Sequence, residues 1–191
     1  MTTELSWVGE TMRQTVPWVG TVDVEFVEVT PERAVLRLPD DPALRNHVGG
    51  PHAAMIFGLG ETATGAVTLA AFASTMDRAT PLPVRSEIAY QRIARGPLTA
   101  QALLTRPAAD VLAELDAGAR PEFGIDVTVT DGEGRETTRM TVVWTLRPNR
   151  CPDYRPARAR GDRRRTREDR SAAGGVARQP RGRRHRGGAQ P

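Results

Sequence analysis

Six segments of the chain alternate apolar and polar residues with a period of two, the pattern of half-buried β-strands. They span residues 22–29, 33–38, 84–91, 98–104, 123–129 and 140–146. The first segment changes phase near Val27, which predicts a β-bulge. The tract Asp131-Gly132-Glu133-Gly134 stands before the last segment and predicts a hairpin turn. Together the six segments predict an antiparallel sheet with one covered face.

One long apolar segment, residues 51–76, interrupts this alternation. It is apolar nearly all round, as in a helix that is buried on every side. We expect Pro51 at its first helical position, where no N–H is needed. Its many glycines and alanines lower helix propensity and indicate that other backbone or a ligand comes close. With shorter helices at 4–14 and 108–117, the pattern predicts an α+β fold in which the sheet wraps around one central helix.

Charge divides the chain into two parts. Residues 149–191 hold 14 arginines and four acidic residues, a net charge of +10, whereas residues 1–148 hold 13 arginines and 19 acidic residues, a net charge of −6. The basic part has almost no large apolar residue after Tyr154, so it cannot bury enough surface to offset its ordering entropy. We therefore predict one folded domain at 1–148 and a disordered arginine-rich tail at 149–191.

Composition narrows the class of protein. The single cysteine, Cys151, excludes an internal disulfide and a cysteine-based zinc site, and we predict neither a metal nor a cofactor. The first residues lack the basic and apolar segments of a secretory signal. No stretch approaches the roughly 20 uncharged apolar residues of a membrane-spanning helix. We expect a cytoplasmic protein without a membrane partner.

The most informative residue is Glu61, which is the only charged residue between Pro51 and Met76. An ionised carboxylate in apolar packing is costly unless it is paired or hydrogen-bonded. One interpretation is that Glu61 faces solvent beside Thr62 and Thr64. The apolar surroundings favour the other interpretation, in which the carboxylate is kept for chemistry.

The start of the long helix holds the other candidate groups. His52 lies nine positions before Glu61, so the two side chains project to opposite sides of a helix and are not an acid–base pair within one chain. His52 could equally stabilise the start of the helix through a hydrogen bond. His47 is a weaker candidate for a catalytic residue. Residues 46–51 are predicted to form a tight loop that leads into the helix N-terminus, whose free N–H groups attract a developing oxyanion.

Four of these residues follow the spacing N-x-x-G-x-x-H with an acid nine positions after the histidine. They are Asn46, Gly49, His52 and Glu61. This spacing resembles the hotdog-fold thioesterases of the phenylacetate-pathway and 4-hydroxybenzoyl-CoA types. Residues 86–96, which include Tyr90 and Arg92, are similar to that family's third strand, which ends in a basic residue and a glycine turn. The resemblance covers about residues 20–148 and implies the hotdog fold.

The resemblance also implies an activity, the hydrolysis of an acyl-CoA or acyl-carrier thioester. It implies that the Ala53 N–H is the oxyanion donor, that Glu61 is the general base or nucleophile, and that Asn46 positions water or substrate. The residues that it places against the substrate are Gly49, His52, Tyr90 and Arg92.

The separation of Ala53 from Glu61 predicts an assembly. Eight residues span about 12 Å along a helix, whereas catalytic contacts are near 3 Å. One carbonyl therefore cannot touch both groups within one chain, and a second subunit must supply one of them if both take part. We expect a homodimer or a dimer of dimers with sites at the interface, as that family has.

Other functions stay open at this point. The family's His-Gly-Gly is His52-Ala53-Ala54 here, and two methyl groups narrow the approach of a substrate, so a non-catalytic acyl-thioester binding protein is the alternative. A dehydratase would need His52 and Glu61 to face each other, which only two subunits allow, and it ranks below hydrolysis. Arginine runs bind nucleic acid nonspecifically, but the tail has no interleaved aromatic residues and the body is acidic, so we do not expect a nucleic-acid partner.

Overall fold

The computed structural model describes residues 6–149 of the chain. Its elements, in chain order, are α1 (Ser6–Thr15), α2 (Pro17–Thr21), β1 (Glu25–Val29), β2 (Arg33–Leu38), η1 (Pro42–Leu44), α3 (Ala53–Phe72), η2 (Ala73–Thr75), β3 (Ala79–Tyr90), β4 (Leu98–Leu104), α4 (Ala108–Asp116), β5 (Glu122–Thr130) and β6 (Glu136–Pro148). This order confirms the predicted succession of a helix, two strands, a long helix and four strands, with α4 in the expected place. The predicted tail lies outside the described residues except for Asn149, and so does Cys151.

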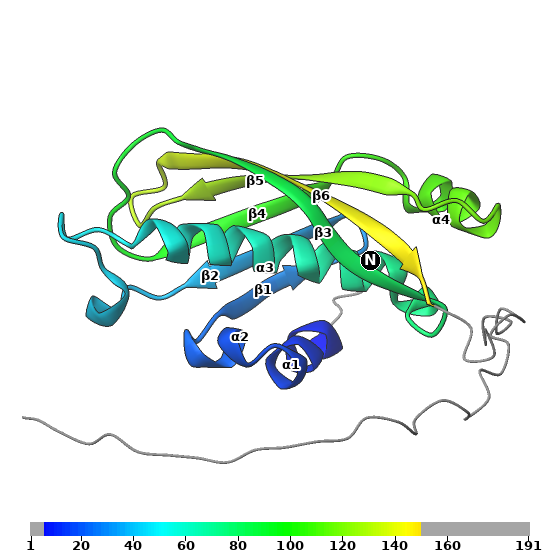
Figure 1. Ribbon diagram of the computed structural model, residues 1–191. Coiled ribbons are helices and arrows are strands. Elements are labelled where there is room, and N and C mark those ends of the chain that lie inside the picture. The colour runs from blue at the N-terminus through cyan, green and yellow to red at the C-terminus, as the bar shows by residue number, and fades with distance from the viewer. Residues whose placement is uncertain (1–5, 150–191) are drawn as a thin grey trace, which may run out of the picture. The chain divides into compact units, whose positions relative to one another are not determined.

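The six strands form one antiparallel sheet in the order β1-β2-β4-β5-β6-β3. In Figure 1 the sheet wraps over α3, which runs along its inner face. The two N-terminal helices, α1 and α2, lie on the other side of α3, near β1. The α+β arrangement of a sheet around one central helix is therefore confirmed, and it leaves α3 between two layers.

The period-two pattern positions the residues of β6 as predicted, whereas β3, which the same pattern predicted to be half-buried, is exposed along most of its length. Every second residue of β6 turns inward, so that Met140, Val142 and Trp144 are buried in the core against α3. The bulge expected in the first strand is a shift of register between Phe26 and Glu28. The core is thus one apolar layer between the inner face of the sheet and the helices.

Strand boundaries differ from the prediction where proline interrupts the pattern. We expected the third strand to begin at residue 84, but β3 begins at Ala79 and includes Pro81 and Pro83. Both prolines are tolerated because β3 is an edge strand, on which one row of N–H groups has no ladder partner to satisfy. The first strand is shorter than predicted and the last one longer, and the five-residue helix α2 was not predicted.

The central helix begins later than its apolar pattern suggested. We expected Pro51 at the first helical position, but this residue forms an isolated β-bridge in the preceding loop. His52 takes the N-cap position, and its Nδ1 accepts a hydrogen bond from the Ala54 N–H at 3.0 Å. The helical run also ends differently, since the last turn, η2, is a 3-10 turn.

The expectation that no stretch resembles a membrane span also needs correction. By length and by a mean hydropathy of 1.3, residues Ala53–Thr75 qualify as one candidate span. In the structure 56% of the most apolar 18-residue window of that stretch is buried within the protein, and α3 serves as the core helix of the sheet.

Candidate functional site

A cavity of about 320 Å³ lies at the N-terminus of α3. The loop before α3 and the loop that follows β3 line it, and it is open to solvent. The cavity brings together four of the residues singled out in the sequence, Asn46, Ala53, Tyr90 and Arg92. Its remaining wall is largely apolar and consists of Val48, Gly50, Pro51, Ile56, Gln91, Ile93 and Ala94. Sequence reasoning had not identified this apolar wall, because only the fold brings the two loops together.

The side chain of Asn46 shapes the loop that leads into α3. Its Oδ1 accepts a hydrogen bond from the Val48 N–H at 3.0 Å, and its Nδ2 donates to the Pro51 carbonyl at 3.2 Å. Gly49 sits within this turn at φ +82°, the left-handed region in which glycine avoids steric strain. Asn46 and Gly49 therefore fix the path of the backbone beside the cavity.

The two loops approach each other closely at Gly50. A Cβ atom on this residue would lie 2.7 Å from the carbonyl oxygen of Ala94, so a larger residue would push the loops apart. The second loop is held in turn by the β5–β6 turn, where the Gly132 N–H donates to the Arg95 carbonyl at 2.9 Å. The walls of the cavity thus depend on backbone contacts between three segments.

The first residue of α3, Ala53, lines this cavity. The Ala54 N–H is occupied by His52, but the Ala53 N–H has no acceptor among the described residues. The helix dipole adds positive potential at this end. Tyr90 donates from its hydroxyl to the Ala53 carbonyl at 3.2 Å and so connects β3 to the start of the helix. An oxygen that gains negative charge in the cavity would find both a donor and a favourable field.

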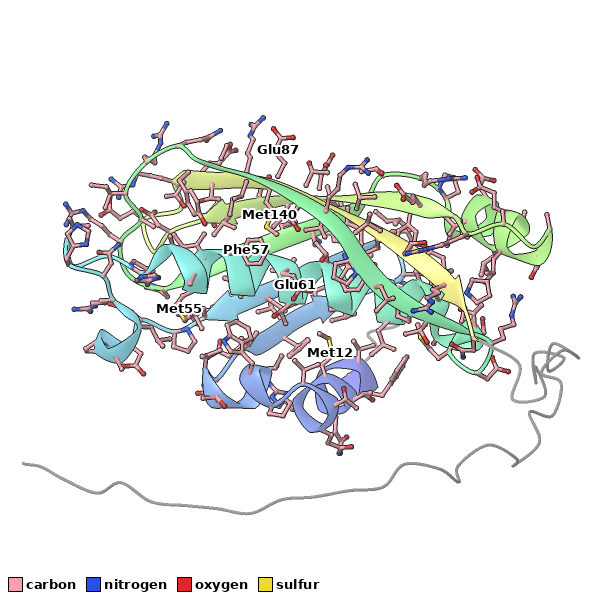
Figure 2. All side chains as sticks on the ribbon, viewed as in Figure 1. Met12, Met55, Phe57, Glu61, Glu87 and Met140 are labelled. Carbon is pink, nitrogen blue, oxygen red and sulfur yellow. The ribbon has the colours of Figure 1, made fainter. Side chains whose placement is uncertain are left out.

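Glu61 lies in the middle of α3 (Figure 2) and does not line the cavity. The helix between Ala53 and Glu61 is continuous, so the predicted separation of about 12 Å along the axis holds. The carboxylate is partly buried, and no side chain within residues 6–149 donates to it or forms an ion pair with it. Burial raises the pKa of Glu61 above its ordinary value. A single chain therefore keeps the carboxylate and the helix-terminal donor apart.

Two hydrogen bonds hold the helix turn that carries Glu61. The Thr64 hydroxyl donates to the Glu61 carbonyl at 2.8 Å, and the indole N–H of Trp144 donates to the Thr64 oxygen at 2.9 Å. Both side chains are buried. This connection to β6 fixes the position of the carboxylate relative to the sheet.

His52 does not line the cavity with the other predicted residues. Its ring is exposed, and its Nδ1 is engaged in the helix cap. This arrangement agrees with the interpretation that His52 stabilises the start of the helix through a hydrogen bond. Within residues 6–149, no group of three or more histidine, cysteine or acidic residues is arranged to hold a metal ion.

A second hollow, of about 470 Å³, lies on the outer face of the sheet and has mainly polar walls. It is lined by Glu87, Ala89, Asp126, Val127, Thr128, Arg139, Met140 and Thr141. Glu87 points away from α3 in Figure 2. The hollow contains none of the residues that the sequence singled out, so the helix terminus is the better candidate site.

A curved antiparallel sheet around one long helix is the hotdog fold, and similar solved structures share it. PA5026 from Pseudomonas aeruginosa, described as a protein of unknown function and probable thioesterase, has a TM-score of 0.68 and 21% identity over 78% of this chain and 99% of its own. A thioesterase family protein from Silicibacter pomeroyi has a TM-score of 0.60 and 18% identity over 74% and 96%. The PaaI protein of the Escherichia coli phenylacetic acid degradation operon has a TM-score of 0.58 and 12% identity over 74% and 95%.

At these identities the likeness establishes the fold, and the chain is a hotdog-fold protein. More narrowly, it belongs to the family described as Domain of unknown function (DUF4442), whose model matches residues 6–146. No curated protein matches the chain.

Proposed function

We propose that this protein hydrolyses acyl thioesters of CoA or of an acyl carrier at a site shared by two copies of the chain. The observation that carries the proposal is the division of groups along α3. At one end Ala53, whose N–H has no acceptor within residues 6–149, lines a cavity, and a partly buried carboxylate lies about 12 Å further along the helix. The thioesterases named among proteins of the same fold support this class of reaction.

In this proposal the cavity binds the thioester carbonyl. The Ala53 N–H and the positive end of α3 stabilise the negative charge that develops on the carbonyl oxygen, which is often the largest electrostatic contribution to acyl transfer. Asn46 holds the loop beside the carbonyl and has one remaining amide hydrogen to direct toward water or substrate.

Glu61 from the second chain supplies the base. Its raised pKa keeps the carboxylate basic enough to take a proton from water as the water attacks the carbonyl carbon. The C–S bond then breaks, and the proton passes to the leaving thiolate. Direct attack by the carboxylate, which would form a transient anhydride that water hydrolyses, uses the same geometry.

The rim of the cavity supplies contacts to the rest of the substrate. Arg92 lines the cavity and pairs with no carboxylate among the described residues, so its guanidinium can reach a phosphate of the pantetheine arm or of CoA. Tyr90 is 49% exposed and presents its ring to the pantetheine chain. Gly49 and His52 act indirectly: Gly49 shapes the loop beside the cavity, and His52 caps the helix whose first residue lines it.

We propose that a second copy of the chain docks at the edge formed by β3. The outer edge of β3 has no partner strand within residues 6–149, and this strand exposes Val84 and Tyr90. Long exposed edges with apolar residues favour pairing with another strand. Twofold pairing at β3 would place the α3 helices of two chains on the same side of a joined sheet. We propose that this homodimer, or a dimer of such dimers, forms the site.

The proposal is tested by measuring the hydrolysis of a panel of acyl-CoA thioesters by the native protein, by Glu61→Gln and by the matched control Glu10→Gln. Glu10 is an exposed carboxylate on α1, outside both the cavity and the edge strand β3. We expect native activity in the control and a loss of at least about a hundredfold in kcat for Glu61→Gln, as for removal of a general base. Equal activity of the three proteins would refute the role of Glu61.

The Ala53 and Ala54 methyl groups, both exposed at the helix start, favour one alternative, a protein that binds acyl thioesters without turning them over. That function predicts micromolar binding of acyl-CoA with no hydrolysis by either the native protein or Glu61→Gln. Calorimetry alongside the hydrolysis assay separates the two functions.

A further inference from the structure

Two glycines flank Glu61 on the same face of α3, Gly58 three residues before it and Gly65 four residues after it. A Cβ atom on Gly58 would lie 2.5 Å from two atoms of the benzo ring of Trp18, and one on Gly65 would lie 3.3 Å from Cε of Met12. Side chains from the N-terminal helices therefore occupy the space that larger residues at these positions would fill.

The opposite side of Glu61 is bounded as well. Phe57 precedes it by one turn and packs against the core, and the next turn carries Thr64 under the ring of Trp144. In Figure 2 Met12 lies between α1 and α3, below Glu61. By helix spacing Glu61 thus lies between two apolar walls, Trp18 with Met12 on one side and Phe57 on the other, and the ring of Trp144 covers the next turn of the helix at Thr64 and Gly65.

The wall formed by Trp18 is fixed in place. It belongs to α2, whose first residue is Pro17, and the neighbouring Val19 is completely buried in the core. The absence of a side chain at Gly58 lets the ring sit directly against the helix backbone. Burial of the neighbouring Val19 therefore anchors the backbone that carries the ring.

From this geometry we infer that Trp18 is a specificity-determining residue that restricts the acyl group at Glu61 to short apolar chains. The inference rests on the proposed function, because it assumes that the acyl carbonyl lies beside Glu61. A chain attached to that carbonyl passes between the walls, where the side chains of Trp18, Met12 and Phe57 favour apolar groups and the benzo ring over Gly58 limits length. One excess methylene in such a pocket changes specificity by about tenfold or more.

The test compares kcat/KM for acetyl-, butyryl-, hexanoyl- and octanoyl-CoA in the native protein, Trp18→Ala and the matched control Trp7→Ala. Trp7 is a tryptophan of the same N-terminal segment whose side chain is 41% exposed. We expect the native protein to prefer the short chains. We expect Trp18→Ala to raise the octanoyl-to-butyryl ratio by at least about tenfold, whereas Trp7→Ala leaves it unchanged. An unchanged ratio in folded Trp18→Ala would overturn the inference.

A second variant covers the case in which loss of the ring destabilises α2. Trp18→Phe keeps an aromatic side chain on α2 but removes the benzo-ring atoms that lie against Gly58, and we expect it to move the preferred length in the same direction by a smaller factor. The failure of the proposed function is detected separately, through the binding of S-alkyl-CoA thioethers, which cannot be hydrolysed. If none of the proteins hydrolyses thioesters but thioether affinity shows the same dependence on chain length, the role of Trp18 in selecting chain length is supported and the catalytic proposal is refuted. Equal affinities for thioethers of all chain lengths, in the native protein and in both Trp18 variants, would refute the role of Trp18 in selecting chain length.

Discussion

The environment of Glu61 is unusual for a charged side chain. Within residues 6–149 its carboxylate has neither a donor nor a cation, while Thr64 and Trp144 hold its helix turn in position. Burial without compensation costs free energy, and proteins retain such groups chiefly where chemistry needs them. The absence of other charges from a 26-residue apolar stretch made this residue conspicuous in the sequence. The partners of its turn could not be predicted, because Trp144 is 80 residues away from Thr64 in the chain.

The raised pKa of Glu61 predicts a pH dependence. A general base acts in its ionised form, so kcat/KM should rise with pH through a value above the ordinary carboxyl pKa of 4.5 and then level off. The same shift means that the ionised form destabilises the fold at neutral pH, because the unfolded chain releases the proton more readily. Glu61→Gln should therefore raise the melting temperature at pH 7 while it abolishes turnover. A lower melting temperature would indicate that the carboxylate has a structural partner.

Asp131 shows the opposite shift. Its side chain, fully covered in the β5–β6 turn, accepts hydrogen bonds from Arg135 and from the Glu133 N–H, and the Arg135 guanidinium is the main cause that lowers its pKa to about 2. We expect Asp131→Ala to lower the free energy of unfolding at pH 7 by about 2 kcal/mol, as for loss of hydrogen bonds to a charged group. Urea denaturation measures this change.

The pH dependence of that loss has a definite sign. Because the folded pKa is depressed, the contribution of Asp131 is complete above the ordinary pKa of 3.8 and disappears as the pH falls toward about 2. The difference between the native protein and Asp131→Ala should shrink over that interval. Glu133→Ala, an exposed change in the same turn, should alter stability by less than about 0.5 kcal/mol. A constant difference at all pH values would contradict the assigned role of the carboxylate.

At the scale of elements, hydrophobic periodicity predicted most of the fold, because five of the six strands pack against α3; only β3, at the edge of the sheet, is exposed along most of its length. The periodicity was less informative where backbone conformation, rather than side-chain burial, determines where an element begins or ends. Pro81 and Pro83 break the pattern of β3 although the edge position admits them, and the helix start depends on the side chain of His52 rather than on Pro51. The cavity wall was not predictable either, since Gly50 meets Ala94 only through tertiary packing.

The start of α3 allows the proposed oxyanion donor, the Ala53 N–H, to be removed without loss of the helix. Ala53 is the first helical residue, and the preceding residue has the extended backbone, ψ 142°, that a following proline requires. We expect Ala53→Pro to fold and to lower kcat by about a hundredfold to a thousandfold, the usual effect of deleting one such donor. Ala53→Gly, which keeps the N–H, is the control and should retain native kcat. Native turnover by a folded Ala53→Pro protein would show that this N–H does not bind the oxyanion.

At the scale of the whole molecule, the rigidity of α3 has a direct consequence for assembly. A continuous helix cannot bring its first residue to a carboxylate two turns further on, so a site that needs both groups requires two helices. The open edge of β3 offers a twofold surface through which two chains can pair. In the proposed dimer, each site takes Ala53 from one chain and Glu61 from the other.

Mixing two inactive variants tests this arrangement most directly. Glu61→Gln and Ala53→Pro proteins are each purified, combined in equal amounts under conditions that exchange subunits, and assayed for acyl-CoA hydrolysis. A heterodimer has one site with both native groups and one with neither, so random exchange should restore roughly a quarter of native activity. A mixture that stays as inactive as its components after exchange, with heterodimers detected by native mass spectrometry, would contradict a site shared between chains.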